Sequence, residues 1–264
     1  MIYDIQKASL MKRVSAWLLD AILLAIAITG FALLMSNIVD IEADYQSYSA
    51  IIEKFNVEAS DNEWNLKVDF VAGTIGDVEF GSLTEEQQEY FSAMANELVK
   101  TDEYQKVCNF IFNKTLIIVS IAFLLAYVLL ELIVPLIFKN GQTIGKKIFA
   151  IAVMRTDGVK ISPVILFIRT ILGKYTIEAM IPVYLLLMHH FGVGSLVTLA
   201  VLVLIPIFQI ILLIVTKTNS CIHDILSSTV TVDLQSQMIF ESLEEKNEYM
   251  LRIHSEDVKN AKYF

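Results

Sequence analysis

Long apolar runs separated by polar stretches dominate the pattern along this chain. The first run covers residues 12–39, and later runs cover residues 114–138, 177–191 and 195–216. A helix needs about 20 mostly apolar residues to cross a bilayer, so the four runs predict four transmembrane helices. The third is short, and residues 164–190 fit either one tilted span or an interfacial helix followed by a span.

The stretch between the first two runs, residues 40–113, is rich in Asp and Glu. Within it, Thr84 and Gln87 have the spacing of a capping box, which begins a helix. Residues 64–70 alternate between apolar and polar positions, as a short strand does. We therefore expect a small, mostly helical insertion. A flexible acidic linker is the alternative, because the stretch contains few large apolar residues.

Residues 139–176 contain several lysines, which predict a cytoplasmic loop. The apolar run at residues 148–154, a turn at Asp157-Gly158 and a return over residues 159–162 predict a small interfacial β-hairpin. An interfacial helix is expected to follow this hairpin.

Two segments follow the fourth run. Residues 217–234 combine a His-Asp pair in a capped turn with alternating β-branched residues that predict a strand, and residues 235–264 predict a charged cytoplasmic tail. Together the elements predict an all-α membrane protein with about four transmembrane helices and both termini in the cytoplasm. We also expect a small cytoplasmic interfacial β-hairpin or sheet and a helical extracytoplasmic insertion.

Composition supports this class. The 264 residues are 55% hydrophobic with a mean hydropathy of +0.59, and the apolar residues lie in blocks rather than at a regular period. The net charge of -9 disfavours nucleic acid as a partner. Cys108 and Cys221 flank different apolar runs, so we expect neither a disulfide nor a metal site, and we expect no cofactor.

Charged residues inside the apolar runs require a physical reason. A carboxylate at the centre of a membrane helix costs roughly 2.5–3.5 kcal/mol, so Asp20 and Glu131 are kept only if they are paired, hydrated or functional. Arg13 and Asp20 share one helix face about two turns apart and cannot touch, so each should find its partner on another segment. Glu131 is expected at the same depth as Asp20.

Two interpretations of these charges remain open. In the first, the charged residues line a hydrated cavity that binds a cation or proton. In the second, they neutralise one another and fix the helix register. These residues are Arg13, Asp20, Glu131, Arg169 and Asp224. In the basic loop, Lys146 and Lys147 are expected to contact anionic lipid. We find no nucleophile with a plausible base in the sequence, so enzymatic activity is not expected.

Several of these residues together resemble the RDD family of membrane proteins. The matching features are Arg13, Asp20 and Asp224, a Gly-x-Thr-x-Gly-Lys loop at residues 141–146, an Asp-Gly turn, Arg169, and the acidic Glu131 before the loop. The resemblance implies a membrane protein for which only a role in transport has been proposed. Residues 40–113 are longer than the short loop that the family usually carries there.

We accordingly expect a multi-pass protein of a bacterial plasma membrane, with the lipid bilayer as its surroundings. The first hypothesis is transport of a cation or small solute coupled to protons through the intramembrane carboxylates, which at this size would require a homo-oligomer. The alternative is a non-transporting scaffold, whose charges are structural and whose external insertion or tail binds an unknown protein partner.

Overall fold

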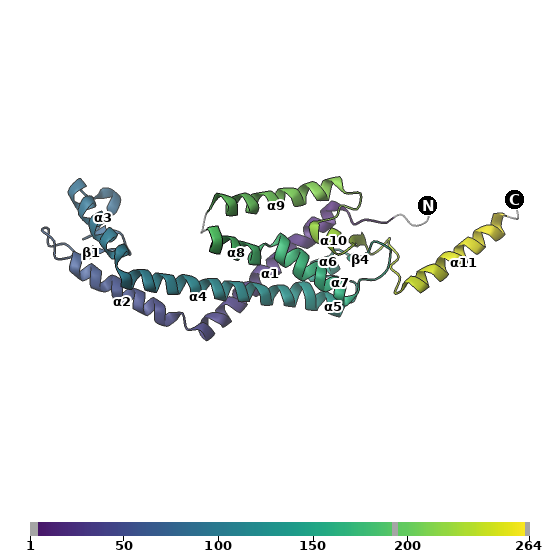
Figure 1. Ribbon diagram of the computed structural model, residues 1–264, viewed down its shortest axis with the longest axis horizontal. Helices are drawn as coiled ribbons and strands as arrows, with labels where there is room; N and C mark the ends of the chain where they lie inside the picture. The colour runs from purple at the N-terminus through teal and green to yellow at the C-terminus, as the bar shows by residue number, and fades with distance from the viewer. Residues whose placement is uncertain (1–4, 192–194, 262–264) are drawn as a thin grey trace. The chain divides into compact units, whose positions relative to one another are not determined.

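The computed structural model describes residues 5–191 and 195–261, and the chain is mostly helical (Figure 1). It divides into two compact units. One contains Met1–Thr29 and Phe123–Phe264, and the other contains Gly30–Ala122. The helices α1 (Leu10–Val39) and α4 (Asp102–Tyr127) contribute residues to both units.

The first unit holds all the predicted charged site residues. Its remaining elements are the π-helix η2 (Val128–Ile133), α5 (Val134–Phe138), α6 (Ile144–Ile148), β4 (Ile151–Arg155), α7 (Pro163–Phe167), the π-helix η3 (Ile168–Glu178), α8 (Ile181–Phe191), α9 (Leu196–Val215), α10 (Ile222–Leu226), β5 (Thr229–Asp233) and α11 (Leu243–Ala261).

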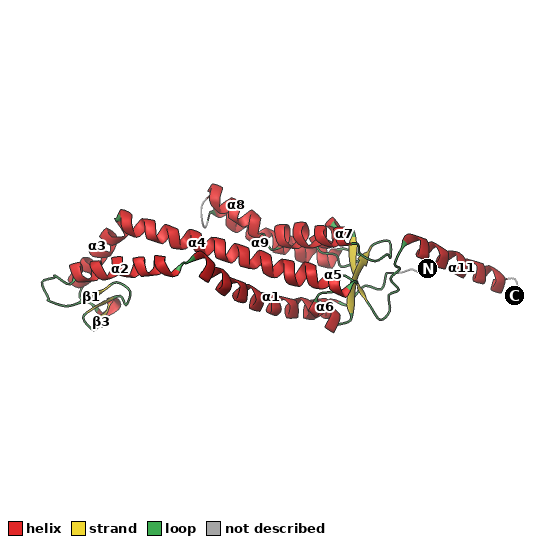
Figure 2. Ribbon diagram, turned by 90° about the horizontal axis from the view of Figure 1, so that it is seen from below, coloured by secondary structure: helices red, strands yellow, loops and turns green. Residues whose placement is uncertain are grey.

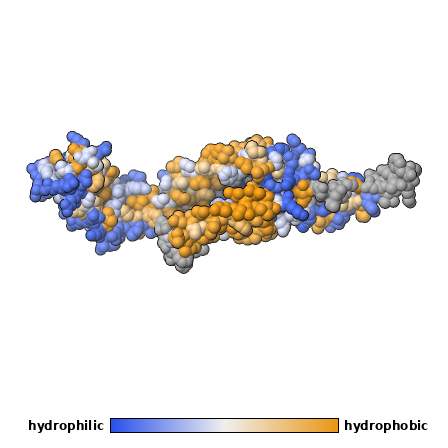
Figure 3. Space-filling view, turned by 90° about the horizontal axis from the view of Figure 1, so that it is seen from above, coloured by the Kyte–Doolittle hydropathy of each residue, from blue (hydrophilic) through white to orange (hydrophobic). Residues whose placement is uncertain are grey.

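Three helical segments in the described part of the chain are long and apolar enough to cross a membrane: Leu10–Val39, Asp102–Phe138 and Leu196–Val215. Many of their large apolar side chains are exposed, and Figure 3 shows apolar side chains gathered over the helical surface. A water-soluble protein would bury such side chains, so this surface fits a lipid environment. The prediction of a mostly helical chain with membrane-length helices is confirmed.

The predicted third span, residues 177–191, is not one continuous helix. The chain leaves η3 after Glu178 and starts α8 at Ile181, and Met180 between them has a positive φ of 57°. The 11 residues of α8 extend about 16 Å, roughly half the thickness of a bilayer core. This segment therefore differs from the three membrane-length helices.

The strands β4 and β5 form an antiparallel pair with Ile151 opposite Asp233 and Arg155 opposite Thr229 (Figure 2). This corrects the predicted hairpin, because the return segment makes only one bridge to β4, at Lys160. The physical reason is burial: Val230 and Val232 of β5 are fully buried and pack in one cluster with residues of β4. β5 thus buries the apolar face of β4 and pairs with its backbone N–H and C=O groups.

The second unit has its own small core. The helix α2 (Glu42–Ala59) and the capped helix α3 (Glu85–Lys100) enclose three short antiparallel strands, β1 (Val68–Asp69), β2 (Thr74–Ile75) and β3 (Val78–Glu79), followed by the short helix η1 (Phe80–Ser82). The buried residues are Ala59, Val68, Ile75 and Leu83. The predicted capping box of Thr84 and Gln87 is present, whereas the predicted strand at residues 64–70 is reduced to Val68–Asp69.

Replacing Ile75 by alanine should destabilise this second unit. Ile75 is 0% exposed, so Ile75→Ala leaves a cavity and should lower the free energy of unfolding by about 2–5 kcal/mol. Limited proteolysis of the full chain in detergent should show faster cleavage within residues 30–122. Val71→Ala is the control, because Val71 is 73% exposed. Equal cleavage rates for the two variants would contradict the assigned core.

Candidate functional site

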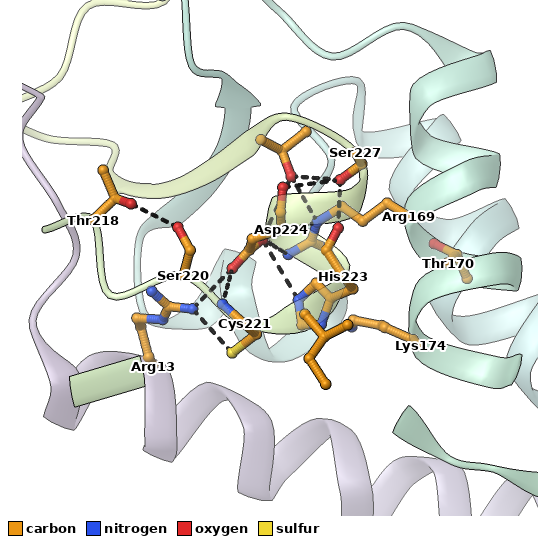
Figure 4. Close-up of polar contacts among 12 residues, drawn as sticks. Arg13, Arg169, Thr170, Lys174, Thr218, Ser220, Cys221, His223, Asp224 and Ser227 are labelled. Carbon is orange, nitrogen blue, oxygen red and sulfur yellow. Dashed lines mark hydrogen bonds and ion pairs between the residues drawn. The ribbon is translucent and has the colours of Figure 1, made fainter. Parts of the chain in front are cut away.

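The carboxylate of Asp224, on α10, lies between two arginine side chains that come from distant parts of the chain (Figure 4). Arg169 of η3 donates to Asp224 Oδ1 from Nη2 at 2.7 Å and from Nε at 3.2 Å. Arg13 of α1 donates from Nη2 to Oδ2 at 3.2 Å. We call these three residues the arginine–aspartate cluster. It joins the first helix, η3 and the turn after α9.

Local hydrogen bonds orient this cluster. Asp224 is the third residue of α10, and its Oδ2 accepts the backbone N–H of Cys221, the residue before the helix, at 3.2 Å. This is the return bond of a capping box. Arg13 also donates to the backbone carbonyl of Asn219 and to the sulfur of Cys221 at 3.7 Å, so its guanidinium is bound to the turn at three points.

The helix η3 contacts α10 through Arg169, Gly173 and Glu178, which recur about once per turn of an i→i+5 helix and so share one face. Gly173 permits close packing, because a Cβ there would lie 2.6 Å from the Cβ of His223. Oε1 of Glu178 lies 2.6 Å from Nδ1 of His223 and accepts its backbone N–H at 2.9 Å. The π-helical repeat therefore presents three partners to one short helix.

The electrostatics of this region keep Asp224 charged. Burial alone would raise the pKa of Asp224, but the nearby His223, Arg169 and Arg13 hold it well below its usual range. The two guanidiniums do so permanently, because arginine does not deprotonate in proteins. Burial lowers the pKa of His223, and Asp224 only partly opposes this shift.

Cys221, His223 and Asp224 place three potential metal ligands within 4.8 Å of one another. Metal binding requires a thiolate and an available carboxylate. Burial raises the pKa of the Cys221 thiol to about 11, with a further rise from Asp224, so the thiol holds its proton at neutral pH. Asp224 is already shared by two guanidiniums. This group of residues therefore does not fit a metal ion.

Asp20 binds the Gly-x-Thr-x-Gly-Lys loop. The Thr143 hydroxyl donates to its Oδ2, and the Gly145 backbone N–H donates to its Oδ1 at 2.7 Å. Thr143 is also the N-cap of α6 and accepts the backbone N–H of Lys146. Gly145 lets α6 approach α1, because a Cβ there would lie 2.3 Å from the carbonyl oxygen of Ala16. The loop is therefore a docking element for the first helix.

Glu131 lies in η2 and makes two contacts with η3. Lys174 donates from Nζ to its carboxylate, and the hydroxyl of Thr170 donates to its backbone carbonyl at 2.9 Å. The second contact has a cause in the sequence. In a regular α-helix that carbonyl would accept the N–H four residues later, but residue 135 is proline and has none. Thr170 supplies the missing donor.

The five predicted charged residues do not form one directly bonded network. Arg13, Arg169 and Asp224 meet, whereas within residues 5–191 and 195–261 neither Asp20 nor Glu131 forms an ion pair with either arginine. Asp20 and Glu131 instead border one narrow space together with Leu23, Leu130 and Ile144. This space has no room for a water molecule, unlike the predicted hydrated cavity.

The two lysines of the basic loop have different surroundings. Lys147 is exposed, and its Nζ lies 3.8 Å from the centre of the Phe138 ring. Lys146 is only 9% exposed, which differs from the lipid-facing position predicted for it. Its burial and the charges of Lys174 and Arg169 lower the pKa of Lys146 to about 7, although Glu131 and Asp20 oppose this. No carboxylate lies within 4.0 Å of Lys146 Nζ in the described chain.

Sequence reasoning missed four residues that complete the site. These are Thr143, Thr170, Lys174 and Glu178. Lys174 and Glu178 lie five and nine residues after Arg169, and in a regular α-helix neither spacing places them on the face of Arg169, so the α-helical repeat did not reveal them. The signal for Thr170 was indirect: Pro135 leaves a carbonyl without its donor, but the sequence does not say which hydroxyl replaces it.

The chain was compared with known proteins and protein families. A family model described as the RDD family matches residues 7–228, a range that includes the arginine–aspartate cluster, both intramembrane carboxylates and the Gly-x-Thr-x-Gly-Lys loop. No curated protein and no solved structure matches the chain.

Removing the charge of Asp224 should destabilise the first unit strongly. Asp224→Asn leaves two buried guanidiniums without their shared anion, and breaking a buried ion pair in this way costs about 3–5 kcal/mol. Chemical denaturation in detergent would measure the loss. Asp233→Asn is the control, because its partner Lys12 is partly exposed and such pairs contribute about 1 kcal/mol or less. Similar losses in both variants would contradict this assignment.

Adding one methyl group at Gly145 should separate α6 from α1. Gly145→Ala places a Cβ 2.3 Å from the Ala16 carbonyl oxygen and 2.9 Å from Cγ of Asp20, so the loop must shift. We expect a loss of about 1–3 kcal/mol, measured as a lower melting temperature in detergent. In the control Gly30→Ala the new Cβ meets nothing within 4 Å, and alanine is the better helix former. A Gly145→Ala variant as stable as Gly30→Ala would refute the close approach.

Proposed function

This chain belongs to the RDD family, and from that premise we propose that it exchanges protons for a cation or small solute across a membrane, through the site bordered by Asp20 and Glu131. The supporting observation is that these two carboxylates, both on membrane-length helices, border the same narrow space. Carboxylates inside membrane helices are costly and commonly mark ion pathways.

The partners of the two carboxylates support exchange. A hydroxyl and a backbone N–H hold Asp20, and a lysine holds Glu131, whereas two permanently charged arginines hold Asp224. A cation can compete more readily with the partners of Asp20 and Glu131 than with the two guanidiniums that bind Asp224. Opening the narrow space requires movement, and the π-helix η2, which contributes Leu130 and Glu131 to its lining, is a place where helix hydrogen bonds are already irregular.

We also propose that residues 164–190 supply a fourth crossing, so that the chain is multi-pass in the plasma membrane with both termini in the cytoplasm. The lysines of the loop after α5 favour this orientation, because basic loops stay on the cytoplasmic side. Residues 40–113 then lie outside. Three helices of membrane length are few to enclose a path, so we propose a homo-oligomer as the transporting unit.

A scaffold or assembly role is the second candidate, and one observation favours it. Gly30–Ala122 forms a compact unit with its own buried core, a feature suited to binding a partner protein. In that case the charges of the first unit are structural, and Asp20 serves only to dock the Gly-x-Thr-x-Gly-Lys loop.

Reconstitution of the purified protein into liposomes distinguishes the two candidates. We expect a preformed pH gradient to dissipate when Na⁺, K⁺ or Li⁺ is added, and Asp20→Asn to reduce the rate at least 10-fold, because the amide keeps the shape but loses the charge. Asp157→Asn is the control, because Asp157 lies in the turn after β4 and does not border the narrow space. No cation-dependent signal from folded wild-type protein would reject transport and leave the scaffold role.

A further inference from the structure

We infer that Nζ of Lys146, and neither of the two carboxylates, is the atom that binds and releases the exchanged proton. This inference rests on the proposed exchange function and names the proton site within it. The step is a simple acid dissociation, in which the ammonium of Lys146 loses H⁺ to become a neutral amine.

The position of Lys146 suits this role. It follows Gly145, the point where α6 is bound to α1, so its backbone is fixed beside Asp20. The charged groups that act on it are Asp20 of α1, Glu131 of η2, and Lys174 and Arg169 of η3. Its side chain is only 9% exposed. It therefore senses both carboxylates of the proposed site while being largely removed from water.

The carboxylates themselves already have donors. Asp20 accepts two hydrogen bonds, from Thr143 and from the Gly145 backbone, and Glu131 accepts one from Lys174. Among the described residues no carboxylate oxygen lies within 4.0 Å of Lys146 Nζ. Within the part of the chain that the structure describes, Lys146 is thus a buried charge without an ion-pair partner.

The direction of the Lys146 pKa agrees with this geometry. Burial has the largest effect and lowers the pKa of Lys146, and the charges of Lys174 and Arg169 lower it further. Glu131 and Asp20 raise this pKa too little to compensate, so it lies at about 7. A lysine in water titrates near 10.4. A group with this pKa changes its charge in the neutral range, as a coupled carrier requires.

The charge change explains the coupling. When Lys146 releases its proton, the groups around the narrow space lose one positive charge, and a monovalent cation between Asp20 and Glu131 restores the balance. When the proton returns, the ammonium again repels that cation. The expected exchange is one proton for one monovalent cation, with no net charge moved.

The first test measures the proton site without any transport. The pKa of Lys146 is lower in the folded than in the unfolded protein, so the unfolded state binds more protons between about pH 7 and 10. The buried ammonium therefore destabilises the folded protein less as the pH rises over that window, and the free energy of unfolding increases. Lys146→Met lacks this contribution. Between pH 7 and 9, the melting temperature of the wild type should rise relative to Lys146→Met by about 5 °C.

Lys147→Met is the matched control, because Lys147 is the exposed neighbour and should follow the wild-type pH dependence. Parallel pH profiles for wild type and Lys146→Met would show that Lys146 titrates as an ordinary lysine, and would overturn the inference. Where Lys146→Met fails to fold, Lys146→Arg replaces it, since arginine keeps the positive charge but does not release its proton.

The second test uses the proteoliposomes with Na⁺, K⁺ and Li⁺. Lys146→Met and Lys146→Arg should both lose cation-driven dissipation of the pH gradient at least 10-fold, while Lys147→Met keeps it. Retained coupling in folded Lys146→Arg would overturn Lys146 as the exchange site and leave the proposed function standing. A wild type that moves no cation would overturn the exchange itself, and the melting profiles would still decide whether Lys146 binds a proton at neutral pH.

Discussion

The buried carboxylate of Asp224 is the constraint on which the first unit depends. It binds Arg13 from the first helix and Arg169 from η3, and it does so from a short helix near the far end of the chain. Taking these three charges out of water costs several kcal/mol per ion, and only good geometry recovers that cost. Two features provide it: the capping bond from Cys221 orients Asp224, and the bare backbone at Gly173 lets α10 reach η3.

The other polar contacts follow from the same need to satisfy buried groups. Pro135 has no backbone N–H to donate to the Glu131 carbonyl of η2, and the hydroxyl of Thr170 donates to that carbonyl instead. Thr170 lies on η3, the helix that also carries Arg169. Lys174 on that helix then meets Glu131. A regular α-helix would rotate Arg169, Gly173 and Glu178 progressively away from one another, whereas the wider π-helical turn keeps them on one face. The unusual helix geometry and the position of the charges therefore have one explanation.

The sequence predicted the long apolar helices and the residues of the arginine–aspartate cluster, because hydrophobic length and the cost of buried charge are local signals. Asp20 and Arg13 were expected to find partners on other segments, and each does, at Thr143 and Asp224. The sequence predicted a strand in each of the two segments but paired β4 with the return over residues 159–162, because strand partners far apart in sequence leave no local signal. The π-helix was not foreseen, because its hydrogen-bond shift depends on tertiary contacts. For the same reason the burial of Lys146 was missed: nothing distinguishes it from Lys147 until α6 docks on α1.

The arginines and the lysines of the first unit differ in whether they can release a proton. Arginine does not release its proton, so Arg13 and Arg169 hold Asp224 in one state at every physiological pH. A lysine removed from water can lose its charge, and Lys146 lies where that loss is felt by both Asp20 and Glu131. If the residues that hold the helices together lost their charge, the packing of the first unit would weaken whenever Lys146 released its proton. Fixed guanidiniums around Asp224 allow an ammonium near the two carboxylates to vary without unfolding the unit that holds it.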